Sequence, residues 1–316
     1  MKALTIITTL ACTTLLMVSC KKDNPQDPTT DKSDLNTFFS TNCKNNTQHF
    51  SVDANAGGVI VGIKGTRVYI NPNSLLNVNN QLVSGNVDIA LIEIYDRATM
   101  VLLNKPTMGK LANGDLSTLL SGGEYYLKIT QNGQELHTTS GVWVSVPTDN
   151  MGGIQAGMSV FDGFIAEDGD LEWELVEDTV AVAQDTIGGS YYEILDGQWG
   201  WTNVDRFYSD PRPKTVLKAK LPAGFDQTNS EVYLTYDGET TALASLDTYT
   251  ADGFFSEHYG LIPIGLEVHF IAVTLIDGEL NYAIQAATIT DGHIQYINAF
   301  TPITQGALAI LINDLP

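Results

Sequence analysis

The side chains best suited to contact a ligand lie in one short segment, Trp199 followed by Gly-Trp-Thr-Asn-Val-Asp-Arg-Phe at 200–207. If this segment is extended, Trp201, Asn203 and Asp205 share one face, because successive side chains of a strand point in opposite directions. Trp199 and Trp201 then offer two flat rings on which a sugar can stack. The polar members of this candidate binding patch are Asn203, Asp205 and Arg206. The alternative is structural: Asn203 and Asp205 form a buried, hydrogen-bonded cluster that fixes a loop.

The chain lacks the short motifs of common catalytic sites. It contains no His-Glu-x-x-His, no Gly-x-Ser-x-Gly and no Cys-x-x-Cys sequence. The five histidines are scattered, and we expect His269, which lies in an apolar run, to be a hydrogen-bonded structural residue. We therefore predict no catalytic residue and no cofactor. Paired carboxylates for glycoside hydrolysis stay open as an alternative, because their separation is set in space and not along the chain.

One acidic run, Glu167-Asp-Gly-Asp170, resembles the beginning of a calcium-binding loop. An EF-hand loop that starts at Asp168 needs glycine at its sixth position and glutamate at its twelfth. Trp173 and Thr179 occupy these positions, so an EF-hand is excluded. We predict a solvated acidic turn and no metal site, with a calcium site of another kind as the open alternative.

The N-terminus reads as a targeting segment. Met1-Lys2 precedes an apolar run from Ala3 to Met17, and Val-Ser-Cys20 follows. The run is too short for a comfortable transmembrane helix and fits a signal peptide over residues 1–19. It resembles a bacterial lipoprotein signal, with Met17 where leucine is usual, and this implies cleavage before Cys20 and lipidation of Cys20. Several acyl chains on one residue anchor a protein stably. An ordinary secretory signal is the alternative.

The residues after Cys20 predict a disordered tether over residues 20–46, because they are rich in Asn, Asp, Pro, Thr, Ser and Lys. Cys43 is expected to be a bystander near its end. Lys21-Lys-Asp23 resembles the start of Bacteroidetes-type lipoproteins, in which a lysine-plus-acidic run marks export to the outer leaflet. The resemblance implies an outer-membrane lipoprotein that is exposed at the cell surface.

Charge excludes several partners. The chain carries 16 Lys and Arg against 37 Asp and Glu, a formal net charge of −21. A surface that binds nucleic acid needs clustered basic residues, and none are present between Ile129 and Asp205. We therefore predict no nucleic-acid partner, and anionic membrane surfaces are disfavoured for the same reason.

The hydrophobic pattern predicts an all-β fold. Asn132-Gly, Asp237-Gly, Asp277-Gly and Asp291-Gly separate apolar or alternating runs, as tight hairpin turns require. In the run 216–221 Leu217 and Ala219 alternate with lysines, while the run 87–95 is apolar on both faces, which is typical of a central strand. One helix is expected at the C-terminus, from Ile303 to Leu315, with Thr304 as its N-cap and Ala307, Leu308, Leu311 and Leu315 on its apolar face.

The first predicted domain, residues 47–150, contains an ordered series of motifs. Gly65-Thr-Arg-Val-Tyr-Ile-Asn-Pro72 comes first, Gly85-Asn-Val-Asp-Ile89 follows, and a strand then ends with Glu93-Ile-Tyr95. This order resembles the β-sandwich domain shared by tight-junction scaffolds, ankyrins and netrin receptors. It resembles more closely the related domain of Bacteroidetes-type surface lipoproteins. The resemblance implies an interaction and scaffolding module, by analogy of fold.

The second predicted domain, residues 196–316, contains the segment 200–207. This segment resembles the Gly-Trp-x-Asn-x-Asp-Arg-Phe motif that follows the first domain in the same lipoproteins, where cysteine is common at the position of Val204. The resemblance implies a second β-sandwich-like domain. An acidic connecting segment, residues 151–195, is expected between the domains, with Leu171, Trp173 and Leu175 on one side of an amphipathic strand.

These observations favour a lipid-anchored envelope protein that acts as a non-enzymatic binding or scaffold module. Its expected partners are the membrane, through the N-terminal lipid, and a protein or glycan ligand. The alternative is a carbohydrate-active hydrolase, or a glycan-binding accessory protein, with acidic residues near Trp199 and Trp201.

Overall fold

The computed structural model describes residues 31–166, 171–177, 180–185, 189–195 and 199–316. The predicted signal peptide, the lipidated Cys20 and the first part of the predicted tether lie outside these residues, as does the acidic turn at 167–170. Strands dominate the described chain, and a short helix lies at the C-terminus. The prediction of an all-β fold with a short C-terminal helix is therefore confirmed.

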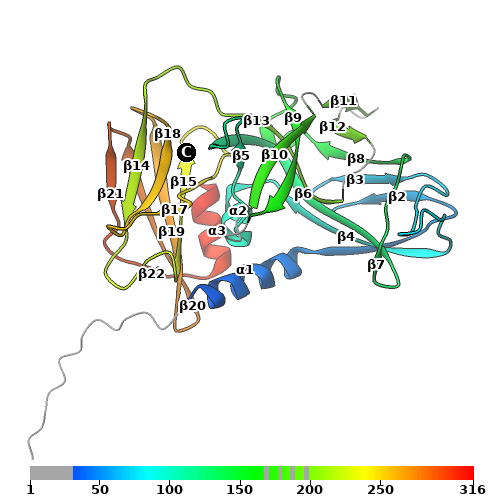
Figure 1. Cartoon of the computed structure of the whole chain (residues 1–316), viewed down its shortest axis with the longest axis horizontal. Coiled ribbons are helices and arrows are strands. Elements are labelled where there is room, and N and C mark those ends of the chain that lie inside the picture. The colour runs from blue at the N-terminus through cyan, green and yellow to red at the C-terminus, as the bar shows by residue number, and fades with distance from the viewer. Residues whose placement is uncertain (1–30, 167–170, 178–179, 186–188, 196–198) are drawn as a thin grey trace, which may run out of the picture.

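The N-terminal half is a β-sandwich (Figure 1). Its larger sheet has the strand order β1 (Gln48–Asp53), β4 (Asn86–Ile94), β6 (Leu116–Gln131), β13 (Gly200–Phe207), β9 (Ser159–Ile165), β10 (Leu171–Glu177) and β5 (Met108–Lys110), with β7 (Gln134–Glu135) paired to β6. The facing sheet has the order β11 (Ala181–Gln184), β12 (Ser190–Leu195), β8 (Val142–Pro147), β3 (Arg67–Ile70) and β2 (Gly58–Val61). Leu91, Leu127 and Val144 are among the buried residues between the two sheets.

The larger sheet also closes on itself, because β5 pairs with both β6 and β10. The strands β6, β13, β9, β10 and β5 therefore form a ring of five. Leu119, Phe161, Leu171 and Trp173 form a small separate core that draws on β6, β9 and β10. The indole N–H of Trp173 donates to the carbonyl oxygen of Pro106 at 3.0 Å, which satisfies its one polar group.

The C-terminal half is a second sandwich. One sheet has the order β17 (Thr248–Tyr249), β18 (Phe255–Pro263), β14 (Lys214–Lys220) and β21 (His293–Tyr296). The other has the order β16 (Ala244–Ser245), β15 (Ser230–Tyr236), β19 (Glu267–Ile276), β20 (Glu279–Thr288) and β22 (Thr301–Pro302). Leu217, Phe255 and Phe270 are buried between them. β14 alternates as predicted, with Leu217 and Ala219 buried and the lysines on the opposite face.

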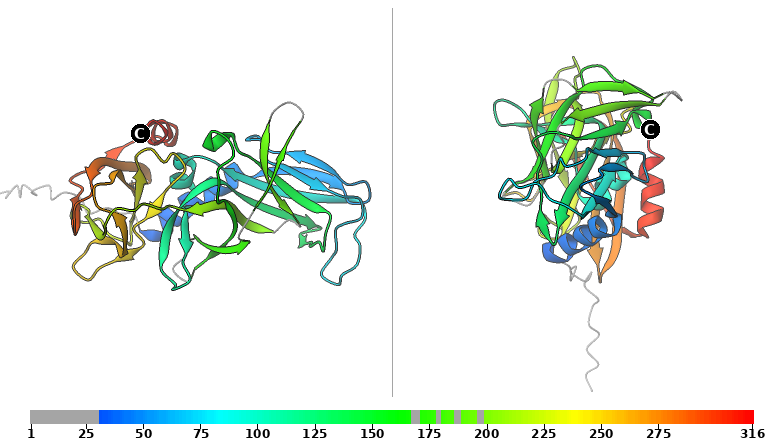
Figure 2. Two further views of the ribbon diagram at one scale, coloured as in Figure 1. Left: turned by 90° about the horizontal axis from the view of Figure 1, so that it is seen from above. Right: turned by 90° about the vertical axis from the view of Figure 1, so that its right-hand side faces the viewer.

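Three helices form a layer between the two sandwiches (Figures 1 and 2). In the part of the chain that the structure describes, these helices are α1 (Lys32–Asn46), α2 (Arg97–Leu103) and α3 (Gln305–Asn313), and one 3₁₀ turn, η1 (Asp149–Met151), lies elsewhere. Leu35 of α1, Met100 of α2 and Leu308 of α3 share one buried core with Ile92 of β4 and Ile271 of β19. The two halves are therefore joined by a common apolar layer, as well as by the chain itself.

The prediction of a disordered tether over residues 20–46 is wrong for residues 32–46, which form α1. Asp31 caps this helix by accepting hydrogen bonds from the backbone of Ser33 and Asp34. Leu35 and Phe39, four residues apart, are buried in the helical layer. The segment is polar on average, so its composition did not indicate the few apolar residues on one side of the helix. The helix is stabilised by the packing of these residues against the rest of the fold.

The predicted domain boundaries also differ from the structure. Most of the expected connecting segment, residues 151–195, consists of strands β9 to β12, which belong to the two sheets of the first sandwich. The sequence predicted that the segment of β13 begins the second domain, but β13 pairs with β6 and β9 in the larger sheet of the first sandwich. Within β10 the predicted alternation holds for Leu171 and Trp173, which are buried, and fails at Leu175, which is exposed next to a shift in the pairing with β9.

Two of the four predicted hairpin turns are formed, whereas Asp237-Gly238 lies in a longer connection and Asp291-Gly292 joins β20 to β21, which pairs with β14 instead. Asn132-Gly133 and Asp277-Gly278 have positive φ at both residues and close hairpins between β6 and β7 and between β19 and β20. The Thr304 hydroxyl caps α3 by accepting from the Ala307 amide, which confirms that prediction. The buried face of α3 differs from the expected one, because Leu308 and Ile312 are buried while Leu311 is 40% exposed.

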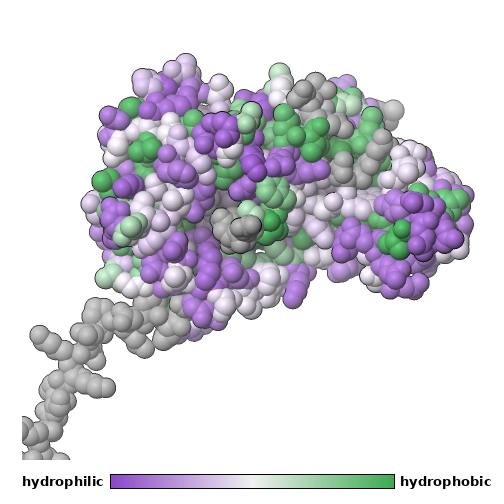
Figure 3. Space-filling model, viewed as in Figure 1, coloured by the Kyte–Doolittle hydropathy of each residue, from purple (hydrophilic) through white to green (hydrophobic). Residues whose placement is uncertain are grey.

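The face of the molecule seen in Figure 1 has a mostly hydrophilic surface, in keeping with the acidic composition (Figure 3). Apolar residues gather at the upper right, over β9 to β12 of Figure 1. The exposed members of these strands are Ile165, Leu175, Val176, Val182 and Leu195.

A bulge in β6 lets one strand serve both the sandwich and the ring. Residues 203 and 205 of β13 pair with Glu124 and Ser121 of β6, so Gly122 and Gly123 supply one extra residue. Gly123 has φ of +141°, and a Cβ there would lie 2.7 Å from both Tyr95 and Val146. Only glycine fits this position without displacing the core.

We expect Gly123→Ala to lower the free energy of unfolding by about 2–4 kcal/mol, from backbone strain and overpacking together. Gly114→Ala is the matched control, because Gly114 has φ of +92° and no heavy atom within 4 Å of its Cβ position. Equilibrium unfolding in urea measures both variants. Equal losses for the two would contradict a packing role for the bulge.

Candidate functional site

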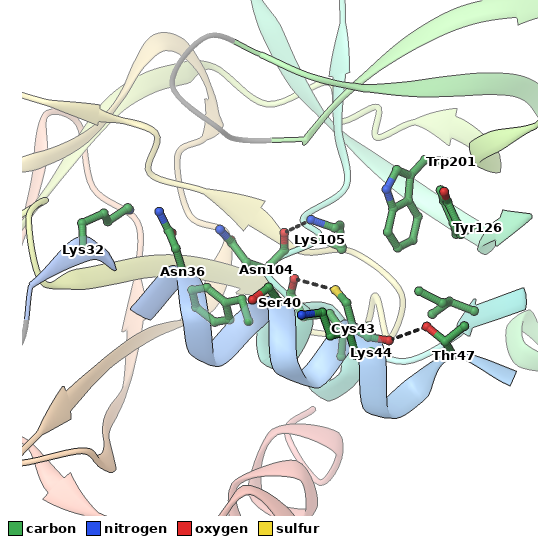
Figure 4. Close-up of a pocket in the computed structure, with 13 residues that line it drawn as sticks. Lys32, Asn36, Ser40, Cys43, Lys44, Thr47, Asn104, Lys105, Tyr126 and Trp201 are labelled. Atoms are coloured by element: carbon green, nitrogen blue, oxygen red, sulfur yellow. Dashed lines mark hydrogen bonds between the residues drawn. The ribbon is translucent and has the colours of Figure 1, made fainter. Parts of the chain in front are cut away.

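A groove with a volume of about 460 Å³ runs between α1 and the face of the larger sheet that is turned away from the first sandwich's core (Figure 4). We call it the α1 groove. The wall from α1 presents side chains from one helical face, at spacings of three or four residues. Its members are Lys32, Asn36, Phe39, Ser40, Cys43, Lys44 and, just after the helix, Thr47.

The opposite wall comes from four other elements. Ile92 lies on β4, Tyr126 on β6 and Trp201 on β13, while Leu103, Asn104 and Lys105 follow from the end of α2. Trp201 and Tyr126 lie together at one end of the groove (Figure 4), with ring centroids 5.2 Å apart. The Lys105 ammonium stands 5.4 Å from the centroid of the Trp201 ring and donates to the Asn104 carbonyl at 3.2 Å.

The charge of the groove is opposite to that of the protein. Three of the nine lysines in the described residues line it, whereas no aspartate or glutamate is among the described lining residues. Lys32 forms an ion pair with Glu231. Lys44 is exposed, and its ammonium has no ionic or hydrogen-bonding partner in the part of the chain that the structure describes. In a chain of net charge −21, the groove is therefore a local basic site.

The structure separates the two tryptophans that the sequence placed together. Trp201 lines the α1 groove, but Trp199 packs against the core of the first sandwich and donates its indole N–H to the Leu136 carbonyl. Gly200 between them has φ of +111°, which breaks the regular alternation of an extended strand. A double stacking surface is therefore not formed, and one indole of the pair lines the groove.

The polar residues of the same segment are buried. Asn203 and Asp205 are both fully inaccessible, and the Asn203 amide donates to Asp205 at 2.7 Å while its oxygen accepts from the Ser121 hydroxyl at 2.8 Å. They form the structural cluster that was the alternative interpretation, across the β6 bulge. Arg206 is half-buried on the opposite side of β13, and it is not among the residues lining the groove.

Sequence reasoning missed Glu124, the most unusual residue of this region. Glu124 is fully buried opposite Asn203, and neither carboxyl oxygen has a hydrogen-bond partner in the described residues. Burial, and then the charge of Asp205, raises the pKa of Glu124 well above its ordinary value. Burial also raises the pKa of Asp205, against hydrogen bonds from Ser121, Gly122 and Asn203.

Cys43 lines the groove, which corrects the expectation that it is a bystander on a tether. Its thiol is half-buried and lies 3.9 Å from the Leu103 carbonyl oxygen. Burial raises the pKa of the Cys43 thiol, with a smaller opposing effect of Lys105. A thiol with a raised pKa is a poor nucleophile at neutral pH, so Cys43 acts here as part of the wall.

Other sequence expectations can be placed. His269 is hydrogen-bonded through Nδ1 to Asp237 at 2.8 Å, as a structural histidine should be. Across the described ranges, no three His, Cys, Asp or Glu side chains are grouped so that they could hold a metal ion. None of the helices described by the structure combines the length and the apolarity that a membrane crossing requires.

Comparison with known proteins identifies no family for this chain. No protein-family model matches the chain, and no curated protein matches it. The resemblances drawn from the motifs of the two predicted domains therefore stay predictions, and the function has to be argued from the groove.

The buried acids generate a prediction on stability. A carboxyl whose pKa is raised in the folded state binds its proton more tightly than the unfolded chain does, so stability falls as pH rises from about 4 through the raised pKa. Glu124→Gln removes this titration. We expect the variant to lose less stability than the parent between pH 5 and pH 8, by up to about 1.4 kcal/mol per pH unit.

Urea unfolding at several pH values measures this difference. Glu135→Gln is the control, since Glu135 is an exposed acid paired with Lys128 at 3.2 Å. Parallel stability curves for the parent and Glu124→Gln would show that the buried carboxyl does not titrate with folding.

Proposed function

We propose that this chain is a lipid-anchored envelope protein that binds an acidic oligosaccharide in the α1 groove and carries out no catalysis of its own. The observation that carries the proposal is the contrast of charge. Lysines alone provide the charged groups among the described residues of the groove, in a protein that is otherwise strongly acidic. Such a site attracts anions selectively, because the rest of the surface repels them.

The neutral side chains of the groove favour a sugar over a simple anion. Asn36, Ser40 and Asn104 supply amide and hydroxyl groups that hydrogen-bond sugar hydroxyls. Trp201 and Tyr126 supply an apolar wall at one end. Sites for small organic ligands combine apolar surface with a few placed polar groups in this way.

The length of the groove favours several sugar units over one. The residues on its helical wall run from Lys32 to Thr47, and a helix of this length spans about 20 Å at 1.5 Å per residue. Lys32 lies at the end of the groove away from the aromatic pair, and Lys44 and Lys105 lie nearer that pair, one on each wall (Figure 4). A chain with repeated carboxylates matches this spacing better than a compact ligand does.

The carboxylates on the two strands that carry Tyr126 and Trp201 favour binding without hydrolysis. Glu124 lies two residues from Tyr126 along β6, and Asp205 lies four residues from Trp201 along β13, yet both are fully buried. A general acid or nucleophile must reach the glycosidic bond, and these groups do not line the groove.

Binding is tested with an oligogalacturonate and with its methyl ester, which keeps the same sugar backbone and removes the charges. We expect the acid to bind and to change tryptophan fluorescence, and the ester to bind at least tenfold more weakly. Lys44→Gln and Lys105→Gln should each weaken binding about tenfold or more, since a hydrogen bond to a charged group contributes about 1.5–3 kcal/mol. Isothermal titration calorimetry measures the affinities.

Lys218→Gln is the matched control, because Lys218 lies on β14 of the second sandwich, pairs with Asp252 at 3.7 Å and does not line the groove. It should bind as the parent does. Equal affinity for the acid and the ester, or no binding of either, would refute a site for acidic sugars.

The anchor is tested separately. We expect Cys20→Ala to move the protein from the membrane fraction to the soluble fraction of the envelope, because lipidation needs the Cys20 thiol and amine. Cys43→Ala is the control and should stay with the membrane. Membrane retention of the Cys20 variant would contradict the lipoprotein signal.

A further inference from the structure

A second cavity, with a volume of about 190 Å³, lies between the two halves of the molecule. We call it the lobe cavity. From the N-terminal half, Met108 of β5, Thr118 of β6 and Phe207 of β13 line it. From the C-terminal half, Tyr236 of β15 and Glu257 of β18 line it. It shares none of its lining residues with the α1 groove.

Glu257 is the unusual member of this cavity. Its side chain is 2% exposed, and its Oε2 has no hydrogen-bond partner among the described residues. Its Oε1 accepts one long hydrogen bond of 3.4 Å, from the Leu261 amide. A buried carboxylate oxygen without a donor costs free energy, so the site is incomplete as it stands.

The backbone holds Glu257 in this position. Between Thr215 and Leu217 of β14 the register with β18 shifts, so that Leu217 faces Glu257 while Thr215 faces Ile262. The extra residues of β18 form a bulge that includes Gly260, with φ of +74°. Bulges of this kind commonly re-aim a side chain next to a functional site.

The other charged groups around the cavity are already engaged or exposed. Asp210 accepts side-chain hydrogen bonds from Arg212 on both oxygens, at 2.9 Å and 2.6 Å, and these hold its pKa well below the ordinary value. The Lys214 ammonium lies at the exposed start of β14 and donates to the Asp210 carbonyl at 2.6 Å. Glu257 is therefore the lining carboxylate with an open oxygen.

Titratable groups on the neighbouring elements face Glu257 as well. They are Asp247, which precedes β17, Tyr236 of β15 and Tyr259 of β18. Burial raises the pKa of Glu257 to about 7, against the smaller lowering effects of the Leu261, Gly260 and Tyr259 backbone amides, and the negative charge of Asp247 adds to the increase. Near neutral pH the carboxyl therefore exists in both forms and responds to a bound charge.

We propose that the lobe cavity binds a small primary ammonium compound, with Glu257 as its counter-ion. A primary ammonium supplies both the N–H donor and the positive charge that the open Oε2 needs. A quaternary ammonium supplies no donor, and a neutral hydroxyl supplies no charge. The rings of Tyr208 and Tyr236, with centroids 4.9 Å apart, and of Phe207 give the aromatic walls that cations favour.

The test uses ethanolamine as the probe and ethylene glycol, its neutral counterpart of similar size, as the comparison. Calorimetry on the purified protein should show one ethanolamine site and no ethylene glycol binding at the same concentrations. Binding requires the ionised carboxylate, so affinity should rise about tenfold from pH 6 to pH 8 for a carboxyl with a pKa of about 7.

Glu257→Gln should abolish ethanolamine binding and its pH dependence. It should also fold, because it replaces a buried acid with a neutral group of the same shape. Thermal unfolding checks both points: ethanolamine should stabilise the parent and leave the variant unchanged. Glu239→Gln is the matched control, since Glu239 is a half-buried acid that does not line the cavity.

Three results would overturn the proposal. They are equal binding of ethylene glycol, unchanged ethanolamine binding by Glu257→Gln, and no ethanolamine binding at pH 8. The last would mean that water alone fills the cavity. Lys105→Gln should bind ethanolamine normally, so the outcome for the lobe cavity is independent of the outcome for the α1 groove.

Discussion

The architecture depends on one apolar layer, the helical core that the two sandwiches share. Ile92 on β4 and Ile271 on β19 belong to different sandwiches and point away from their own sandwich cores. Each of these side chains needs an apolar surface to pack against, and the three helices provide that surface to both. The fully buried guanidinium of Arg97 completes this layer by donating to the carbonyls of Leu315 and Pro316, so the end of the chain is held against α2.

The same layer creates the candidate binding site. Because α1 turns Leu35 and Phe39 into the core, its adjacent face, with Asn36, Ser40 and Lys44, stands opposite the sheet and the end of α2. The groove is therefore the space that remains between helix α1 and the larger sheet that the helix covers. The buried acids across the β6 bulge lie behind it, in a region from which water is excluded. Their burial explains why Asn203 and Asp205 do not line the groove beside Trp201.

Sequence reasoning succeeded where the signal was local and failed where it depended on packing. The turns at Asn132 and Asp277 and the cap at Thr304 follow from backbone preferences that a few neighbouring residues determine. The helix α1 depends on Leu35 and Phe39 meeting partners far along the chain, which no average of composition can indicate. The motif around Trp201 identified one groove residue, but Glu124 and the lysines had no sequence signal because only the fold brings them together.

The closed ring of β6, β13, β9, β10 and β5 also affects how the protein meets other polypeptide chains. A sheet that ends in an open strand offers unpaired amide and carbonyl groups to any extended chain nearby, which invites strand addition and aggregation. Here β10, which would otherwise be terminal, is paired with β5, and β5 is paired back to β6. On this side of the larger sheet the strands are paired with one another, so contacts with other molecules depend on side chains.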